Sequence, residues 1–139
     1  MKCCGIDIAG NSAILITVGR DEAGNLTLVR DACSRIELKD GTDQASVRAF
    51  FQAVHAFGNR DVILFAVRGR TTRGQFSGGG NGLKIEGLLQ IALENEVVVK
   101  SPQTIAAYLR KSDLGDCPDL PKNQQRAFQT ACCALDQAQ

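Results

Sequence analysis

The sequence lacks the features that are typical of membrane, secreted and zinc-binding proteins. No apolar run approaches the roughly 20 residues of a membrane-spanning helix, and no apolar signal region follows Met1. Six cysteines are present, but none forms a Cys-x-x-Cys pair, and the one histidine, His55, cannot complete the usual zinc spacing. Because the net charge is only +1, no global field favours nucleic acid or a membrane surface. These absences predict a cytoplasmic protein whose thiols stay reduced.

The length and composition predict one domain over residues 1–139. The chain is 44% apolar and 22% charged, which is ordinary for a globular protein. A chain of this length buries roughly two-thirds of its unfolded surface, so it folds without disulfides or a structural metal. The sequence leaves the oligomeric state open, with a dimer among the options.

Hydrophobic periodicity predicts the element order β-β-β-α-β-α-β-α-α. The first three strands form an antiparallel meander, because Gly10-Asn11 and Gly24-Asn25 favour tight turns between them. The predicted elements are strands within Cys4–Ser12 and over Ser12–Val18 and Leu26–Leu38, a helix ending at Gly58, a strand over Asp61–Val67, a helix over Leu83–Leu93, a strand over Glu96–Lys100, and helices that begin near Pro102 and Pro121.

The first strand carries a carboxylate, Asp7, among apolar residues, where it is costly unless it has partners. The motif Gly5-Ile6-Asp7-Ile8-Ala9-Gly10 and the stretch Val97–Ile105 resemble the ribonuclease H-like superfamily, most closely its Holliday-junction resolvase branch. Gly80–Leu88 is similar to the helix that follows strand four in that branch. The length resembles that of a small uncharacterised bacterial family of the same superfamily. The resemblance covers nearly the whole chain.

The resemblance implies an α/β fold of the ribonuclease H-like kind. The expected sheet is five-stranded and mixed, with strand order 3-2-1-4-5 and helices on both faces. Actin-like ATPases share the first hairpin, but they clamp a nucleotide between two such domains, so we favour the resolvase-like interpretation.

The resemblance also implies Mg²⁺ or Mn²⁺ as the cofactor of an endonuclease, because two-metal nucleases gather three or four carboxylates around their ions. Asp7 matches the family's first carboxylate. Glu86 is the candidate second metal ligand, and Asp136, the one acid in the last helix, is the candidate third catalytic residue. Against this, the end of the fourth strand, where the family has its second carboxylate, holds Arg68, which would repel Mg²⁺. Asp7 is therefore either a catalytic metal ligand or a structural residue that closes the hairpin or pairs with Arg68.

A basic segment follows the predicted strand Asp61–Val67. Arg68, Arg70 and Arg73 alternate with glycine and threonine at the carboxyl end of a parallel strand, where open α/β sheets usually bind ligands. Guanidinium forks suit phosphate oxygens, although a solvated loop would have the same composition. We therefore expect these arginines to bind branched or single-stranded nucleic acid, with a degenerate nuclease site. The alternative is a non-enzymatic scaffold or interaction protein that kept the fold without the chemistry.

Overall fold

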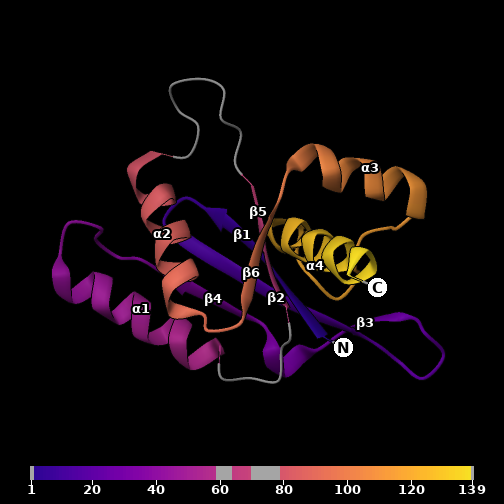
Figure 1. The fold of residues 1–139 in the computed structure, drawn as a ribbon, viewed down its shortest axis with the longest axis horizontal. Coiled ribbons are helices and arrows are strands. Elements are labelled where there is room, and N and C mark those ends of the chain that lie inside the picture. The colour runs from indigo at the N-terminus through magenta and orange to yellow at the C-terminus, as the bar shows by residue number, and fades with distance from the viewer. Residues whose placement is uncertain (1, 59–63, 70–78, 139) are drawn as a thin grey trace.

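The computed structural model describes residues 2–58, 64–69 and 79–138 (Figure 1). Its strands are β1 (Lys2–Ala9), β2 (Ser12–Arg20), β3 (Leu26–Leu28), β4 (Ser34–Glu37), β5 (Leu64–Arg68) and β6 (Glu96–Lys100). Its α-helices are α1 (Gln44–Gly58), α2 (Gly79–Ala92), α3 (Pro102–Ser112) and α4 (Gln125–Gln137), and two short 3-10 turns are η1 (Arg30–Ala32) and η2 (Lys122–Gln124).

β1 lies at the centre of a mixed sheet. The strand order is β3-β2-β1-β5-β6, and β4 also pairs with β2. β1 runs antiparallel to β2 and parallel to β5, which in turn runs parallel to β6. The predicted α/β fold class and the predicted order around a central first strand are confirmed.

The predicted third strand, Leu26–Leu38, is interrupted and forms two strands, so the sheet has six strands where we expected five. The interruption is η1, where the amide of Ala32 donates to the carbonyl of Val29 (3.1 Å) and closes a local turn. Both halves pair with β2, so the interruption leaves the strand order intact. The charged residues Arg30 and Asp31 occupy this turn and are exposed.

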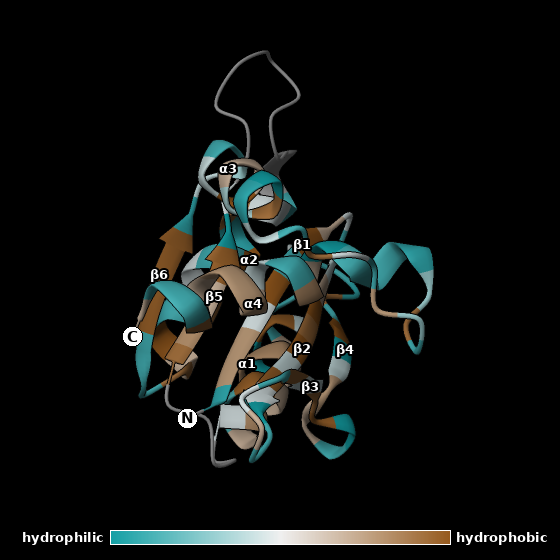
Figure 2. Ribbon diagram, turned by 90° about the vertical axis from the view of Figure 1, so that its right-hand side faces the viewer, coloured by the Kyte–Doolittle hydropathy of each residue, from teal (hydrophilic) through white to brown (hydrophobic). Residues whose placement is uncertain are grey.

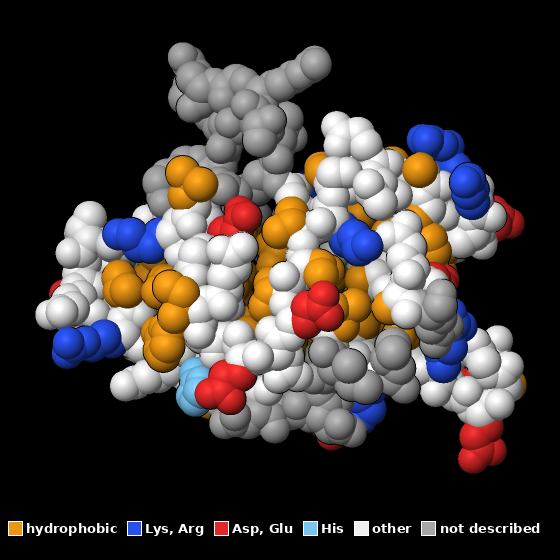
Figure 3. All heavy atoms as spheres, viewed as in Figure 1, with side chains coloured by type: hydrophobic (Ala, Val, Ile, Leu, Met, Phe, Trp, Pro, Cys, Tyr) orange, Lys and Arg blue, Asp and Glu red, His pale blue; other side chains and the backbone are white. Residues whose placement is uncertain are grey.

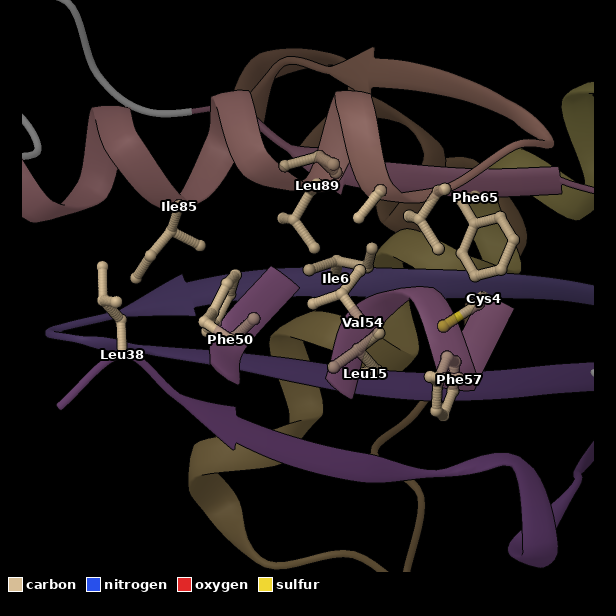
Figure 4. Close-up of a cluster of buried hydrophobic side chains, with 14 residues drawn as sticks. Cys4, Ile6, Leu15, Leu38, Phe50, Val54, Phe57, Phe65, Ile85 and Leu89 are labelled. Carbon is tan, nitrogen blue, oxygen red and sulfur yellow. The ribbon is translucent and has the colours of Figure 1, made fainter. Parts of the chain in front are cut away.

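The helices cover the two faces of the sheet separately. α1 and α2 lie on one side of the strands and α4 on the other (Figure 1), and the strands between them are mostly hydrophobic (Figure 2). Side chains of β1 alternate between these faces, since Cys4 and Ile6 pack in the cluster under α1 and α2 (Figure 4), whereas Cys3 packs in the cluster under α4. We call the second side the α4 face.

Side-chain capping bonds define the starts of α1 and α3, and the start of α3 near Pro102 is confirmed. Asp43 accepts a hydrogen bond from the amide of Ser46 (3.2 Å) before α1, and Ser101 accepts one from the amide of Thr104 (3.1 Å) before α3. Pro102 follows as the first helical residue.

All six cysteines are free thiols, as predicted. Burial raises the pKa of Cys3 and of Cys132 to about 12, and it also raises the pKa of Cys4, Cys33 and Cys133. Neutral thiols of this kind behave as small core residues.

Gly5 sets the distance between α4 and the sheet. A Cβ atom at this position would lie in contact with the backbone carbonyl of Ala127 and 2.5 Å from the amide nitrogen of Ala131. Both contacts are with helix backbone, which cannot move aside as a flexible side chain would. The missing side chain therefore allows α4 to lie directly on β1.

We predict that Gly5→Ala destabilises the protein by about 3 kcal/mol or more, because the added methyl group forces the helix off the strand. Gly87→Ala is the matched control. It adds the same atom in the interior of α2, where nothing lies within 4 Å, and it should stabilise by roughly 0.5–1 kcal/mol through helix propensity. Urea unfolding of both variants measures the two changes, and similar effects in the two would refute the tight α4–β1 contact.

Candidate functional site

Asp7 lies near the carboxyl end of β1 on the α4 face. Its neighbours Ile6 and Ile8 pack towards α1 and α2, which leaves Asp7 on the same side of the strand as Gly5. The residue is only 7% exposed. Burial raises the pKa of the Asp7 carboxyl group, while the positive charges of Arg68 and Arg126 oppose that rise. A carboxylate at this position is thus partly deprived of water and faces two guanidinium groups.

Arg68 is the last residue of β5, and the strand register brings it level with Asp7. Ile6 of β1 pairs with Val67 of β5, so the next residues along these parallel strands are Asp7 and Arg68. Arg68 is half-buried, and its pKa is lowered by burial and by the charge of Arg126, against the opposing effect of Asp7. The expectation that Arg68 stands near Asp7 therefore agrees with the geometry.

Arg126 lies near Asp7 in the first turn of α4, the helix that covers this face of the sheet. The next residue, Ala127, is the one whose carbonyl lies against Gly5, so the close packing of the helix holds Arg126 near Asp7. Arg126 is exposed. Within residues 2–58, 64–69 and 79–138, no hydrogen bond or ion pair joins the three side chains, and they interact through space. We call Asp7, Arg68 and Arg126 the Asp7 site.

These residues do not fit a divalent metal ion. The Asp7 site has two positive charges and one negative charge, which repel a dication. Across the described part of the chain, no group of three or more His, Cys, Asp or Glu side chains is arranged to hold a metal. Mg²⁺ needs oxygen ligands, and guanidinium groups offer none. The predicted metal role of Asp7 thus stays a prediction that the surrounding charges disfavour.

Glu86 lies on α2, on the opposite side of the sheet from α4. The neighbouring residue Ile85 and Leu89 one turn later are fully buried in the cluster under α1 and α2. The side chain of Glu86 is half-buried on that helix. The structure therefore does not place the predicted second metal ligand on the face to which Asp7 belongs.

Asp136 lies near the far end of α4, ten residues after Arg126 and hence about 15 Å further along the helix axis. Its carboxylate forms an ion pair with Arg20 at the end of β2 and accepts a hydrogen bond from the hydroxyl of Tyr108 in α3. These bonds tie three elements together. The structure thus separates Asp136 from Asp7, and the geometry supports a structural role for it in place of the predicted catalytic one.

The other two predicted phosphate ligands, Arg70 and Arg73, lie outside the described residues. Arg126, by contrast, was not among the predicted site residues. The only signal for it in the sequence is its position in the first turn of the last helix, and the contact of that helix with Gly5 is needed to place it.

The chain matches a known sequence family and several solved structures. The sequence profile of a family described as "Protein of unknown function (DUF3010)" matches residues 1–134. No curated protein matches the sequence. Within residues 2–58, 64–69 and 79–138, no helix is both long and apolar enough to cross a bilayer.

Several Holliday-junction resolvases have similar structures. RuvC of T. thermophilus, solved with a Holliday junction substrate, gives a TM-score of 0.71 at 16% identity over 99% of this chain and 95% of that one. The fowlpox virus resolvase, solved with substrate Holliday junction DNA, gives 0.54 at 13% identity over 99% of each chain. The yeast mitochondrial resolvase Ydc2 gives 0.55 at 10% identity over 79% of this chain and 57% of that one. The chain therefore has a fold like that of these resolvases, as the resemblance implied.

We predict that Asp7→Asn stabilises the protein at neutral pH by on the order of 1 kcal/mol, because it removes a charge whose burial is incompletely compensated. A raised pKa in the folded state means that ionised Asp7 costs stability above that pKa. The gain should therefore vanish as the pH falls below the ordinary value of 3.8. Thermal unfolding between pH 3 and pH 7 measures the effect, and the exposed Asp116→Asn is the control.

The same melting curves test for a metal. Neither Mg²⁺ nor Mn²⁺ should raise the melting temperature of the wild type relative to Asp7→Asn. A rise in the wild type that disappears in the variant would contradict the conclusion that the Asp7 site does not fit a metal.

Proposed function

We propose a function for this chain, which belongs to the family described as "Protein of unknown function (DUF3010)". The protein binds the phosphate groups of nucleic acid, and its nuclease site is degenerate. The observation that carries the proposal is the Asp7 site, where two arginines flank the position of the first carboxylate of the resembling nucleases. The carboxyl ends of β1 and β5, where the site lies, are the usual place for ligands in an open α/β sheet.

The chemistry of the site favours an anion. Guanidinium groups form paired hydrogen bonds with phosphate oxygens and stay charged at any physiological pH. Arg126 is exposed and Arg68 half-exposed, so both can meet a ligand from solvent. Arg70 and Arg73 follow within a few residues of Arg68, and we include them as further phosphate ligands.

Branched or single-stranded nucleic acid is the proposed ligand. The support is the fold itself, since two of the similar structures were solved with Holliday junction DNA. Sequence preference should be slight, because phosphate contacts position a protein without reading bases. We also propose that the protein acts in the cytoplasm, where its buried free thiols would stay reduced.

An interaction protein without enzymatic activity is the second candidate. Leu83 and Ile91 of α2 are 64% and 71% exposed, and Val99 of the edge strand β6 is 49% exposed. Figure 3 shows hydrophobic side chains at the surface over these elements. Exposed apolar groups that gather in this way are a common sign of a protein interface.

We predict weak, salt-dependent binding to a labelled four-way junction and to a labelled single strand, measured by fluorescence anisotropy. Dissociation constants should fall in the non-specific range of about 10⁻⁴ to 10⁻⁶ M at physiological salt. With about four phosphates neutralised by the four arginines, log affinity should fall with log salt at a slope of roughly −2.8 to −3.6. Arg68→Ala with Arg126→Ala should flatten that slope by about 1.5, and EDTA should leave it unchanged.

Arg48→Ala is the matched control. Arg48 is exposed on α1, on the opposite side of the sheet, so its loss removes the same charge without touching the Asp7 site. No binding by the wild type at low salt would refute the nucleic-acid proposal and leave the interaction protein in its place. A double variant that keeps the full slope would show that the Asp7 site is not the binding surface.

A further inference from the structure

One transverse row of the sheet carries positive side chains from one edge towards the other. Lys100 of β6 pairs with Arg68 of β5, and Arg68 lies level with Asp7 of β1. Asp7 pairs with Ile14 of β2, which pairs in turn with Arg35 of β4. The row thus crosses five strands and includes three cations and a single carboxylate.

Side chains in register on neighbouring strands point to the same face of a sheet. Ile14 is 2% exposed and belongs to the cluster under α4, so Arg35 next to it lies on the α4 face, as Asp7 does. Strands are about 4.8 Å apart, so three intervals from β5 to β4 place the backbones of Arg68 and Arg35 about 14 Å apart. Arg126 on α4 approaches the row near its middle, beside Asp7.

The cations of this row and the neighbouring Arg126 differ in whether their side chains already form hydrogen bonds or ion pairs. Lys100 donates a hydrogen bond to the side-chain oxygen of Gln137 (2.8 Å) and so is partly committed to α4. Arg35 and Arg126 are exposed, and within the described ranges neither guanidinium forms an ion pair or a hydrogen bond. The nearest carboxylate to Arg35 on its own strand is Glu37, which shares the face and is exposed.

We infer that Arg68, Arg126 and Arg35 form one phosphate track that guides a single nucleic-acid strand from β5 to β4, past the first turn of α4 at the end of the sheet where β1 and β5 end. This inference rests on the proposed function and extends it to Arg35, a residue of the edge strand far from the basic segment in the sequence. About 14 Å corresponds to roughly four phosphates of one stacked strand, at 3.4 Å each. The three arginines therefore contact separated phosphates along one strand.

The track has no means of reading bases. No aromatic side chain belongs to the row, so base stacking adds nothing there, and the strand is held through its backbone. Buried Asp7 lies between Arg68 and Arg35 and weakens the attraction in the middle of the track, so exposed Arg35 at its far end contributes free of that carboxylate. Binding along the track is therefore independent of sequence and dependent on length.

The test compares Arg35→Ala with the control Arg48→Ala, using labelled oligothymidine strands of about twelve and about three nucleotides in a salt series. Arg35→Ala should flatten the salt slope for the longer strand by about 0.7, the value for one phosphate of a single strand. It should leave the slope for the shorter strand unchanged, because that strand cannot reach from Arg68 to Arg35. Arg48→Ala should change neither slope.

Glu37→Gln removes a negative charge from β4, the strand that carries Arg35, so its effect on binding should be opposite to that of Arg35→Ala. Removing this carboxylate should tighten binding of the longer strand without affecting the shorter one. Both substitutions are of exposed side chains, and unchanged melting temperatures confirm that the fold is kept.

The outcomes separate this inference from the proposed function. If the wild type binds but Arg35→Ala and Arg48→Ala behave alike on the longer strand, the track is refuted while phosphate binding at the Asp7 site stands. An equal effect of Arg35→Ala on both lengths would also refute the track, because it indicates a general charge effect. If the wild type binds neither strand at low salt, the proposed function itself fails.

Discussion

The close approach of α4 to β1 at Gly5 is the contact on which the rest of the site depends. No side chain larger than hydrogen fits between the strand and the carbonyl of Ala127. Because Arg126 immediately precedes Ala127 and Asp7 follows Gly5 by two residues on the same face, that contact sets the position of a cation near a buried carboxylate. A packing requirement of the core therefore also determines the electrostatics at the surface.

The charges around Asp7 define what this edge of the sheet can bind. Two guanidinium groups face the carboxylate, yet the pKa of Asp7 is still raised, because burial outweighs their attraction. The group of three carries a net positive charge, so it favours an anion over a dication. The chain thus has a fold similar to that of a resolvase solved with a Holliday junction, and a shared fold does not fix the chemistry of the site.

Much of the fold was predictable from local patterns, because each of them reports on its own residues. The glycine turn after Asp7 indicated the first hairpin, and Ser101-Pro102 indicated the start of α3. The break in the predicted strand Leu26–Leu38 was missed, since the alternating charges of that segment suit an edge strand as well as a turn. The expected order of strands survived this error because both fragments pair with β2.

The candidate site was only partly predictable, because its members meet through tertiary packing. A position of Arg68 beside Asp7 was one of the alternatives open from the sequence, and the strand register agrees with it, since adjacent parallel strands end at the same edge of a sheet. The position of Arg126 depends on how α4 packs against Gly5. The position of Arg35 depends on the register between β2 and β4. The spacing of residues in the sequence predicts neither position. Asp136 was predicted to join Asp7 because the resemblance implied a carboxylate from the last helix. In the structure Asp136 lies at the end of α4 far from Arg126, where it forms an ion pair with Arg20.

We propose that the Asp7 site binds phosphate, at the position where the resemblance led us to expect a metal ligand. The most direct test is a nuclear magnetic resonance titration of the ¹⁵N-labelled protein with Mn²⁺ and, separately, with a short single strand. The account predicts that Mn²⁺ causes no selective broadening of the amide signals around Asp7, and that the strand shifts the side-chain Nε signals of Arg68 and Arg126. Selective broadening around Asp7 by Mn²⁺, with no shift of those arginine signals on adding the strand, would contradict it.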